Sequence, residues 1–176
     1  IDPALIKGAQ MVLFCVKSTD TESAAMLMAP FLEGDTLVLS MQNGVDNAER
    51  LQTLLHREIM PVAVYVAAEM AGPGHVRHHG RGELVIGPAD RAGEVVDLFA
   101  TASVPVRVSE NVMGDLWAKL VINCAYNALS AIAQRPYGEL VQAVGVDEVM
   151  RDVLAECHAV AAADGICIPG DSWEAI

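Results

Sequence analysis

The stretch that decides the fold reads Met11-Val12-Leu13-Phe14-Cys15-Val16, followed directly by Lys17-Ser18-Thr19-Asp20. A short, continuous apolar run is typical of a strand buried on both faces, as in a parallel sheet. Ser, Thr and Asp after it favour a helix start, because their side chains cap the first turn. The stretch therefore predicts a strand at residues 11–16 and a helix that ends near residue 31.

The alternation of strand and helix continues after this stretch. Gln42-Asn43-Gly44 turns the chain between a second strand and a second helix. Short links of this kind imply right-handed crossovers and a parallel sheet. The expected elements are strands at residues 36–40 and 59–68 and a helix from residue 46 to about residue 56.

Glycine-rich turns divide the next segment. Gly72-Pro73-Gly74 predicts a sharp turn. Residues 75–79 and 83–86 predict two short strands, and Gly80-Arg81-Gly82 between them predicts that they form a hairpin. A helix at residues 89–101 and a strand at residues 104–108 are expected to follow.

The character of the sequence changes near residue 109. No convincing strand follows, and long helices are expected at residues 112–134 and 145–163. Arg135-Pro136-Tyr137-Gly138 ends the first of them, because proline cannot continue a helix. The change of period predicts an α/β domain in residues 1–109 and a helical domain in residues 110–176.

Composition disfavours two classes of partner. The chain has 176 residues, 53% of them hydrophobic, and a formal net charge of −12. An acidic protein repels phosphate backbones, so nucleic-acid binding is not expected. No apolar run approaches the roughly 20 residues of a membrane span, and the first residues do not resemble a signal peptide. We therefore expect a cytoplasmic protein that does not bind membranes.

The cysteines and histidines do not predict a metal site. None of the cysteines forms a Cys-x-x-Cys pair and each lies in an apolar context, so reduced, buried thiols are expected. His78 and His79 are neighbours on a strand and face opposite ways. No Cys and no second group of His lies near His75, His78 and His79 in the sequence, so the four ligands of a tetrahedral metal site are not available there. The cysteines are Cys15, Cys124, Cys157 and Cys167.

Lys119, Asn123 and Asn127 are spaced i, i+4, i+8 in the expected helix at residues 112–134. At about 100° per residue they form one polar stripe on a helix that is otherwise apolar almost all round. Burying an amide or an ammonium without a partner is unfavourable, so the stripe must face water, a partner or a cleft. Two interpretations stay open: a narrow solvent-facing stripe, or a cleft in which Lys119 supplies a proton and the asparagines orient a ligand.

Asn43 and Lys17 follow the carboxyl ends of two expected strands. Ligands of parallel sheets bind at these ends, so both residues are candidate binding residues. An ordinary Asn-Gly turn and a plain surface lysine are the alternatives.

The chain resembles the ketopantoate reductases (2-dehydropantoate 2-reductases) over nearly its whole length. The most specific part is Leu116-Trp117-Ala118-Lys119-Leu120-Val121-Ile122-Asn123-Cys124-Ala125-Tyr126-Asn127-Ala128-Leu129-Ser130-Ala131-Ile132. Val16-Lys17, Gln42-Asn43-Gly44, Ile86-Gly87 and Gly138-Glu139-Leu140 are similar to the family in the same order.

This resemblance implies a Rossmann-type fold followed by an all-helical domain. Residues 1–109 would be the C-terminal part of an NADP-binding Rossmann domain, and residues 110–176 the first part of a substrate-binding and dimerisation domain. The activity would be the NADPH-dependent reduction of 2-dehydropantoate to pantoate, a step of pantothenate and coenzyme A biosynthesis. The implied partners are a small 2-keto acid and a second copy of the chain.

The resemblance also implies roles for the candidate residues. Lys119 would be the general acid that protonates the carbonyl oxygen. Asn123 and Asn127 would hydrogen-bond the substrate. Asn43 would lie beside the nicotinamide and the substrate, and Lys17 at the cofactor edge of the cleft.

Several features of the family are not found in residues 1–176. These are the Gly-x-Gly-x-x-Gly loop, the basic residue that selects NADPH, and a Ser and a Glu of the later helices. We therefore expect a fragment that binds NADPH weakly or not at all and is inactive alone. Alternatives are a reductase of another 2-keto acid, a 3-hydroxyacid-type or prephenate-type dehydrogenase, and a non-catalytic paralogue or dimerisation module.

Overall fold

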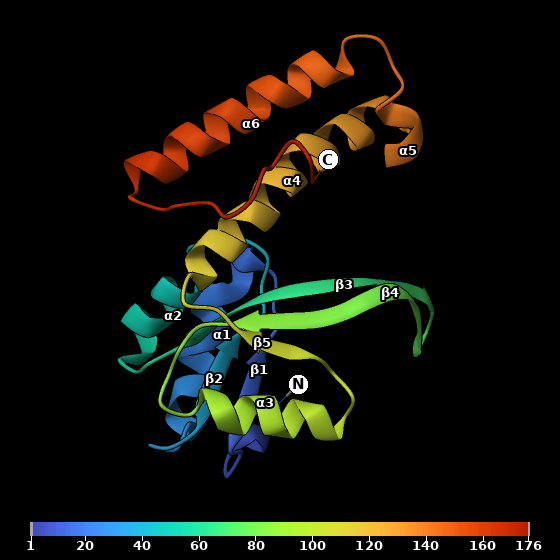
Figure 1. The fold of residues 1–176 in the computed structure, drawn as a ribbon. Helices are drawn as coiled ribbons and strands as arrows, with labels where there is room; N and C mark the ends of the chain where they lie inside the picture. Colours follow the sequence, from blue (N-terminus) through green and yellow to red (C-terminus); the bar gives the residue numbers. More distant parts are fainter. Residues whose placement is uncertain (1, 176) are drawn as a thin grey trace. The chain divides into compact units, whose positions relative to one another are not determined.

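A computed structural model describes residues 2–175 of the chain, which form two compact units (Figure 1). The first unit ends at Val112 and the second begins at Met113. The first unit contains a five-stranded sheet with helices around it. The second unit is helical in its described residues. The predicted fold class, an α/β sheet followed by a helical part, is confirmed.

The sheet has the strand order β1-β2-β3-β4-β5. β1 pairs with β2, β2 with β3, and β4 with β5 in parallel, whereas β3 and β4 are antiparallel. The parallel sheet expected for the first three strands is therefore confirmed, and the sharp turn predicted at residues 72–74 connects the antiparallel β3/β4 pair. The strands are β1 Met11–Phe14, β2 Leu37–Ser40, β3 Met60–Gly72, β4 His75–Ile86 and β5 Val106–Val108.

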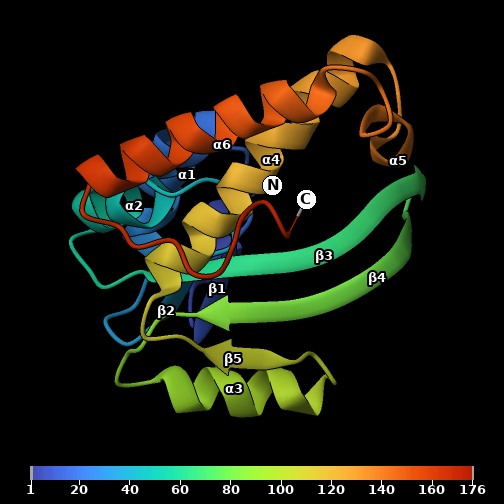
Figure 2. The same cartoon turned by 45° about the horizontal axis from the view of Figure 1, so that its top comes forward.

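The predicted hairpin around Gly80-Arg81-Gly82 is wrong. β4 is one strand from His75 to Ile86, and it pairs along its length with β3 across the turn at Pro73 and Gly74. Gly80 and Gly82 have φ of 143° and 139°. These backbone conformations occur where the β3/β4 register shifts, so the glycines absorb β-bulges and do not reverse the chain. Figure 2 shows the resulting long, curved β3/β4 ribbon.

The helices begin and end close to the predicted positions, with some differences: the 3-10 turn at Pro3–Ile6 was not predicted, and the helix expected from residue 89 begins at Ala92. The helix expected to reach residue 31 is α-helical only to Met28, because Pro30 has no N–H to continue the ladder, and a 3-10 turn follows. The short helix α5 was not predicted. The elements are η1 Pro3–Ile6, η2 Ser18–Asp20, α1 Thr21–Met28, η3 Ala29–Phe31, α2 Asn47–Leu55, α3 Ala92–Thr101, α4 Val112–Ala133, α5 Tyr137–Leu140 and α6 Val146–Ala163.

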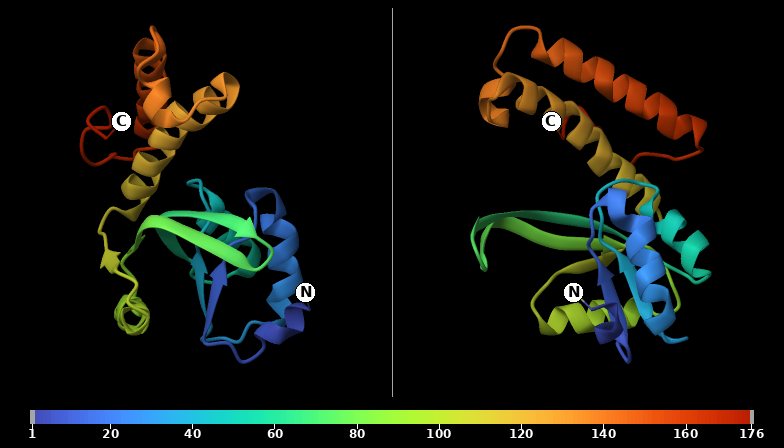
Figure 3. Two further views of the ribbon diagram at one scale, coloured as in Figure 1. Left: turned by 90° about the vertical axis from the view of Figure 1, so that its right-hand side faces the viewer. Right: turned by 180° about the vertical axis from the view of Figure 1, so that it is seen from behind.

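Helices cover both faces of the sheet at β2, which explains the continuous apolar run of this strand, whereas Leu13 on the edge strand β1, expected to be buried, is 47% exposed. Val38 and Leu39 are neighbours on β2, point to opposite faces and are 1% and 0% exposed. Leu39 belongs to the core cluster under α3, and Val38 to the cluster under α1 and α2. Figure 3 shows α3 on one side of the sheet and α1 on the other.

The second unit is built on α4 and α6, whose apolar faces meet. Val121 and Ala125 of α4 share a core cluster with Met150 and Leu154 of α6. By length and composition alone, α4 is apolar enough to cross a membrane, so the expectation that no segment reaches this limit was too strong. The core helix of a soluble protein passes the same test, so this property carries little weight.

The expectation of buried cysteines is wrong at two positions. Cys15 and Cys167 are exposed, and Cys124 and Cys157 are partly buried. Cys15 follows the last residue of β1, where the chain leaves the covered part of the sheet. Burial raises the pKa of the Cys157 thiol to about 11, with a contribution from the neighbouring Cys124.

Candidate functional site

The carboxyl ends of β1 and β2 lie side by side. Phe14 and Ser40, the last residues of the two strands, are partners in the parallel register. The two loops that follow line a pocket of about 190 Å³, to which Lys17 and Asn43 both contribute. The structure thus brings these two predicted residues together at the edge where parallel sheets bind ligands.

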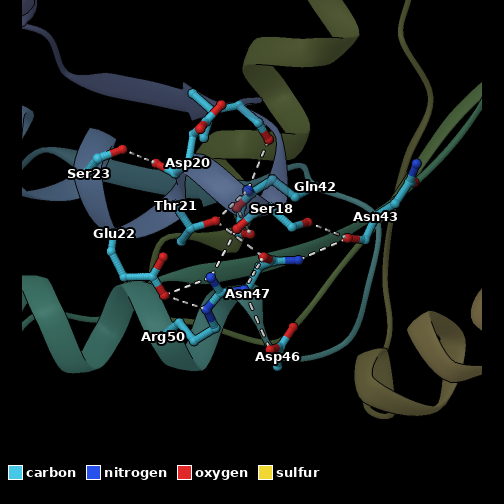
Figure 4. A network of polar contacts seen from close by, with 12 residues as sticks. Ser18, Asp20, Thr21, Glu22, Ser23, Gln42, Asn43, Asp46, Asn47 and Arg50 are labelled. Carbon is cyan, nitrogen blue, oxygen red and sulfur yellow. Dashed lines mark hydrogen bonds and ion pairs between the residues drawn. The ribbon is translucent and has the colours of Figure 1, made fainter.

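The backbone of Asn43 is held from two sides (Figure 4). Its carbonyl oxygen accepts a hydrogen bond from Asn47 Nδ2 at 2.9 Å and a longer one from Ser18 Oγ at 3.4 Å. Asn47 is the first residue of α2 and only 3% exposed. The donor that fixes the Asn43 turn is therefore itself held inside the protein.

A buried chain of polar groups links the two loops. Gln42 Nε2 donates to the carbonyl oxygen of Val16 at 3.0 Å and to Thr21 Oγ1 at 2.9 Å. The Thr21 hydroxyl donates in turn to Asn47 Oδ1 at 3.4 Å. Thr21 and Gln42 are 0% and 7% exposed. These bonds join the end of the β1 loop to the start of α2, so the positions of Lys17 and Asn43 depend on each other.

Arg50 closes the network on its solvent side. Its guanidinium donates to Glu22 Oε1 at 2.7 Å, to the Ser18 carbonyl oxygen at 3.0 Å and to Asn47 Oδ1 at 3.3 Å. The hydrogen bond from Arg50 lowers the pKa of the Glu22 carboxyl below its ordinary value. A pair this exposed adds little stability, and its effect is to fix the Asn47 side chain.

Gly44 is the position of the Asn43 turn that tolerates substitution least. Its φ is +109°, and a Cβ there would lie 3.0 Å from Asn47 Nδ2. Gly44→Ala is expected to lower the free energy of unfolding by about 1–3 kcal/mol, because it adds backbone strain and displaces the Asn47 amide. Urea denaturation measures this, with Gly93→Ala as the control, since nothing lies within 4 Å of a Cβ at Gly93 on α3. Equal stability of the two variants would contradict the expectation.

The other three predicted residues lie on one continuous helix in the second unit. Lys119, Asn123 and Asn127 occupy α4 at a spacing that places them on a common stripe. Asn127 Oδ1 accepts a hydrogen bond from the Tyr137 hydroxyl at 2.5 Å. The Tyr137 ring stacks on Tyr126 with 4.5 Å between centroids. The structure thus gives the last amide of the stripe a fixed partner.

Tyr137→Phe tests whether this contact orients Asn127. The variant keeps the ring stacked on Tyr126 and removes only the hydroxyl that the amide oxygen accepts from. If Asn127 binds substrate, KM for the keto acid should rise by roughly fivefold, about the value of one hydrogen bond. Steady-state kinetics of the complete gene product measures this, and an unchanged KM would show that Asn127 needs no such support.

Thr21, Asn47 and Tyr137 carry little sequence signal. Asn47 follows Asn43 by four residues, but an Asn at a helix start is ordinary. Tyr137 lies in a segment whose only recognised role was to end a helix. The role of each residue depends on contacts with residues distant in sequence. The hydrogen bond between Thr21 and Asn47, for example, joins residues 26 positions apart.

A pocket of about 280 Å³ lies at the opposite, amino end of β2. Its two arginines donate to backbone carbonyl oxygens: Arg57 to Thr36 at 3.0 Å and Arg91 to Asp35 at 2.5 Å. Because these cations hold the loop before β2, we assign them a structural role. Among residues 2–175 there is no group of three or more His, Cys, Asp or Glu side chains that could hold a metal ion.

Two family models match the chain over most of its length. Residues 2–91 match the family described as "Ketopantoate reductase PanE/ApbA". Residues 111–176 match the family described as "Ketopantoate reductase PanE/ApbA C terminal".

Individual relatives agree with these matches. A 2-dehydropantoate 2-reductase of Halobacterium salinarum is 32% identical over 95% of this chain and 57% of its own length. The crystal structure of a PanE/ApbA family ketopantoate reductase from Ralstonia eutropha JMP134 is 60% identical, with a TM-score of 0.94 over 99% of this chain and 58% of its own. D-mandelate dehydrogenase in complex with NADH shares the fold at 20% identity, with a TM-score of 0.84 over 94% of this chain and 56% of its own. The chain thus spans somewhat more than half the length of these proteins.

Proposed function

Because this chain belongs to the ketopantoate reductase (PanE/ApbA) family, we propose that its protein reduces 2-dehydropantoate to pantoate with NADPH, in pantothenate and coenzyme A synthesis. The observation that carries the proposal is the stripe of Lys119, Asn123 and Asn127 on α4. The stripe aligns one ammonium and two amides along a helix whose core face is apolar. A reaction that develops negative charge on an oxygen uses such a set of donors.

Lys119 is the residue that we assign as the general acid. Hydride attack on a ketone places negative charge on the carbonyl oxygen, and a positioned ammonium both stabilises this charge and donates a proton to it. Lys is suited to this because its ammonium is a compact charge that carries a transferable proton.

Asn123 and Asn127 are assigned to substrate binding. The amide oxygen of Asn127 accepts from Tyr137, so its role would be to donate through Nδ2. Asn123 lies one helical turn before it and one turn after Lys119, so the same face presents a proton donor and two amides. A 2-keto acid has carbonyl and carboxylate oxygens that accept such bonds.

The pocket at the carboxyl ends of β1 and β2 fits the nicotinamide end of a cofactor. It offers an ammonium at Lys17 and an amide at Asn43, on a turn whose backbone is already fixed by Asn47. When bound, NADPH supplies the hydride. Asn43 would orient the ring amide, and Lys17 would lie at the cofactor edge. The family relation supports a nicotinamide cofactor, and the choice of NADPH over NADH is part of the proposal.

The roles of the two units and the assembly belong to the same proposal. Residues 1–109 would serve the cofactor, and residues 110–176 the substrate and a homodimer contact. A ketopantoate reductase of Staphylococcus aureus that shares this fold is described as dimeric. We also place the protein in the cytoplasm, because the family match over residues 111–176 contains the whole of α4, whose apolar character suits the core of a helical domain.

The proposal is tested with the complete gene product and a panel of 2-keto acids. Loss of NADPH absorbance with ketopantoate as the preferred substrate is the expected result, with NADH in parallel to settle the cofactor. Preference for another keto acid would keep the chemistry and change the substrate. No turnover with any keto acid, in a folded protein that binds NADPH, would overturn the proposed reaction.

A further inference from the structure

The bond from Asn47 to the Asn43 backbone links the candidate cofactor pocket to the interior of the first unit. Asn47 Nδ2 donates to the Asn43 carbonyl oxygen at 2.9 Å, while Asn47 Oδ1 accepts from Thr21 and from Arg50. The nitrogen of this buried amide is thus bound to the Asn43 turn, and its oxygen to side chains of α1 and α2 (Figure 4). Amides placed in this way fix one backbone conformation, because rotation of the side chain would break every bond at once.

We propose that Asn47 is a positioning residue of this enzyme, which sets the Asn43 turn for contact with the nicotinamide end of the cofactor. The inference rests on the proposed function, because it takes Asn43 as the residue that meets the cofactor. Asn47 lines no part of the pocket and acts only through the carbonyl that it holds.

The substitution Asn47→Asp separates this bond from the others. An aspartate keeps an oxygen for Thr21 and Arg50, but it replaces the donor facing the Asn43 carbonyl with a second acceptor. Two acceptors at this separation repel, so the turn must move. The fold should tolerate the change, because a carboxylate at the first residue of a helix interacts favourably with the helix dipole and here lies beside Arg50.

The matched control is Asp46→Asn, which makes the reverse exchange one position earlier. Asp46 is exposed, and its carboxylate lies 3.6 Å from Arg50, a distance at which such a pair adds little. In the complete gene product we expect kcat to fall at least about tenfold in Asn47→Asp, because small misplacements of reacting groups are costly. The Kd for NADPH should rise about fivefold, the value of one hydrogen bond. Asp46→Asn should match the wild type in both.

A second pair of variants distinguishes positioning from packing. Thr21→Val keeps the volume but removes the hydroxyl that joins Gln42 to Asn47, whereas Thr21→Ser keeps the hydroxyl and loses a methyl group. A positioning role predicts a lower kcat for Thr21→Val than for Thr21→Ser. A packing role predicts the reverse order, because the serine leaves a small cavity. If Asn47→Asp does not fold, the order of kcat in the two Thr21 variants still tests whether the network positions the Asn43 turn.

The outcomes separate this inference from the proposed function. Wild-type turnover together with unchanged kcat and Kd in folded Asn47→Asp would overturn the positioning role alone. A wild type that binds NADPH without reducing any keto acid would overturn the reaction, and the Kd values would still decide the role of Asn47. A wild type that does not bind NADPH would overturn both.

Discussion

Replacement of Lys119 by alanine is expected to lower kcat of the complete gene product by roughly 100-fold or more, the usual scale of general-acid loss. The physical reason is that α4 then presents the two amides of the stripe without a proton or a positive charge for the developing alkoxide. The effect should fall on kcat more than on KM, because the ammonium acts most strongly when charge appears on the oxygen. Steady-state oxidation of NADPH with ketopantoate measures it.

Two further substitutions make this result specific to the ammonium. Lys119→Met keeps most of the length of the side chain and should be as slow as the alanine variant. Lys7→Ala removes a lysine that is exposed at the end of η1 and should leave turnover unchanged. A Lys119→Ala enzyme with wild-type kcat, or an equal loss in Lys7→Ala, would remove Lys119 from the mechanism.

The second large effect is expected at Leu39, in the centre of the sheet. Leu39 is 0% exposed on β2 and packs in the cluster between the sheet and α3. Leu39→Ala removes buried methyl groups and leaves a cavity, so the free energy of unfolding should fall by about 2–5 kcal/mol. Urea denaturation followed by circular dichroism measures the change.

The control makes the same chemical change on the helix that covers this cluster. Leu98 on α3 is 52% exposed, and Leu98→Ala should alter stability by about 0.5 kcal/mol or less. Comparable losses in the two variants would mean that the cluster around Leu39 is not the main core of the first unit.

The strands of the first unit were predictable because their signal is local. The apolar run at Met11–Phe14 predicted a strand, and the structure has one there. Burial on both faces is found in β2, between helices on either side of the sheet, but not in the edge strand β1, where Leu13 is 47% exposed. The proximity of Lys17 and Asn43 in one pocket was also predictable. It follows from the rule that loops after parallel strands leave the sheet at one edge.

The hairpin could not be predicted, because strand register is a property of two segments. Gly80-Arg81-Gly82 has the composition of a turn, and only pairing with β3 shows that its glycines absorb bulges. Exposure of Cys15 depends similarly on where β1 leaves the covered sheet. The local sequence pattern predicts where a strand or helix forms, whereas its pairing with other segments determines its register and which side chains are exposed.

The network around Asn43 escaped prediction for the same reason. Thr21, Gln42 and Asn47 come from three separate segments, and each alone is an ordinary polar residue near a helix start or a turn. The contact of Tyr137 with Asn127 needs the unpredicted helix α5 to bring the hydroxyl back to α4. Contacts between residues that are far apart in the chain cannot be identified from the local pattern of a single sequence.

The central claim is that this protein transfers a hydride from a nicotinamide to the carbonyl carbon of a 2-keto acid. The most direct test is to incubate the complete gene product with ketopantoate and NADPH deuterated at the transferable position of the ring, and to analyse the product by mass spectrometry. The account predicts pantoate that carries one deuterium on its carbinol carbon, formed in proportion to the NADPH oxidised. NADPH oxidation without labelled pantoate, or unlabelled pantoate alone, would contradict it.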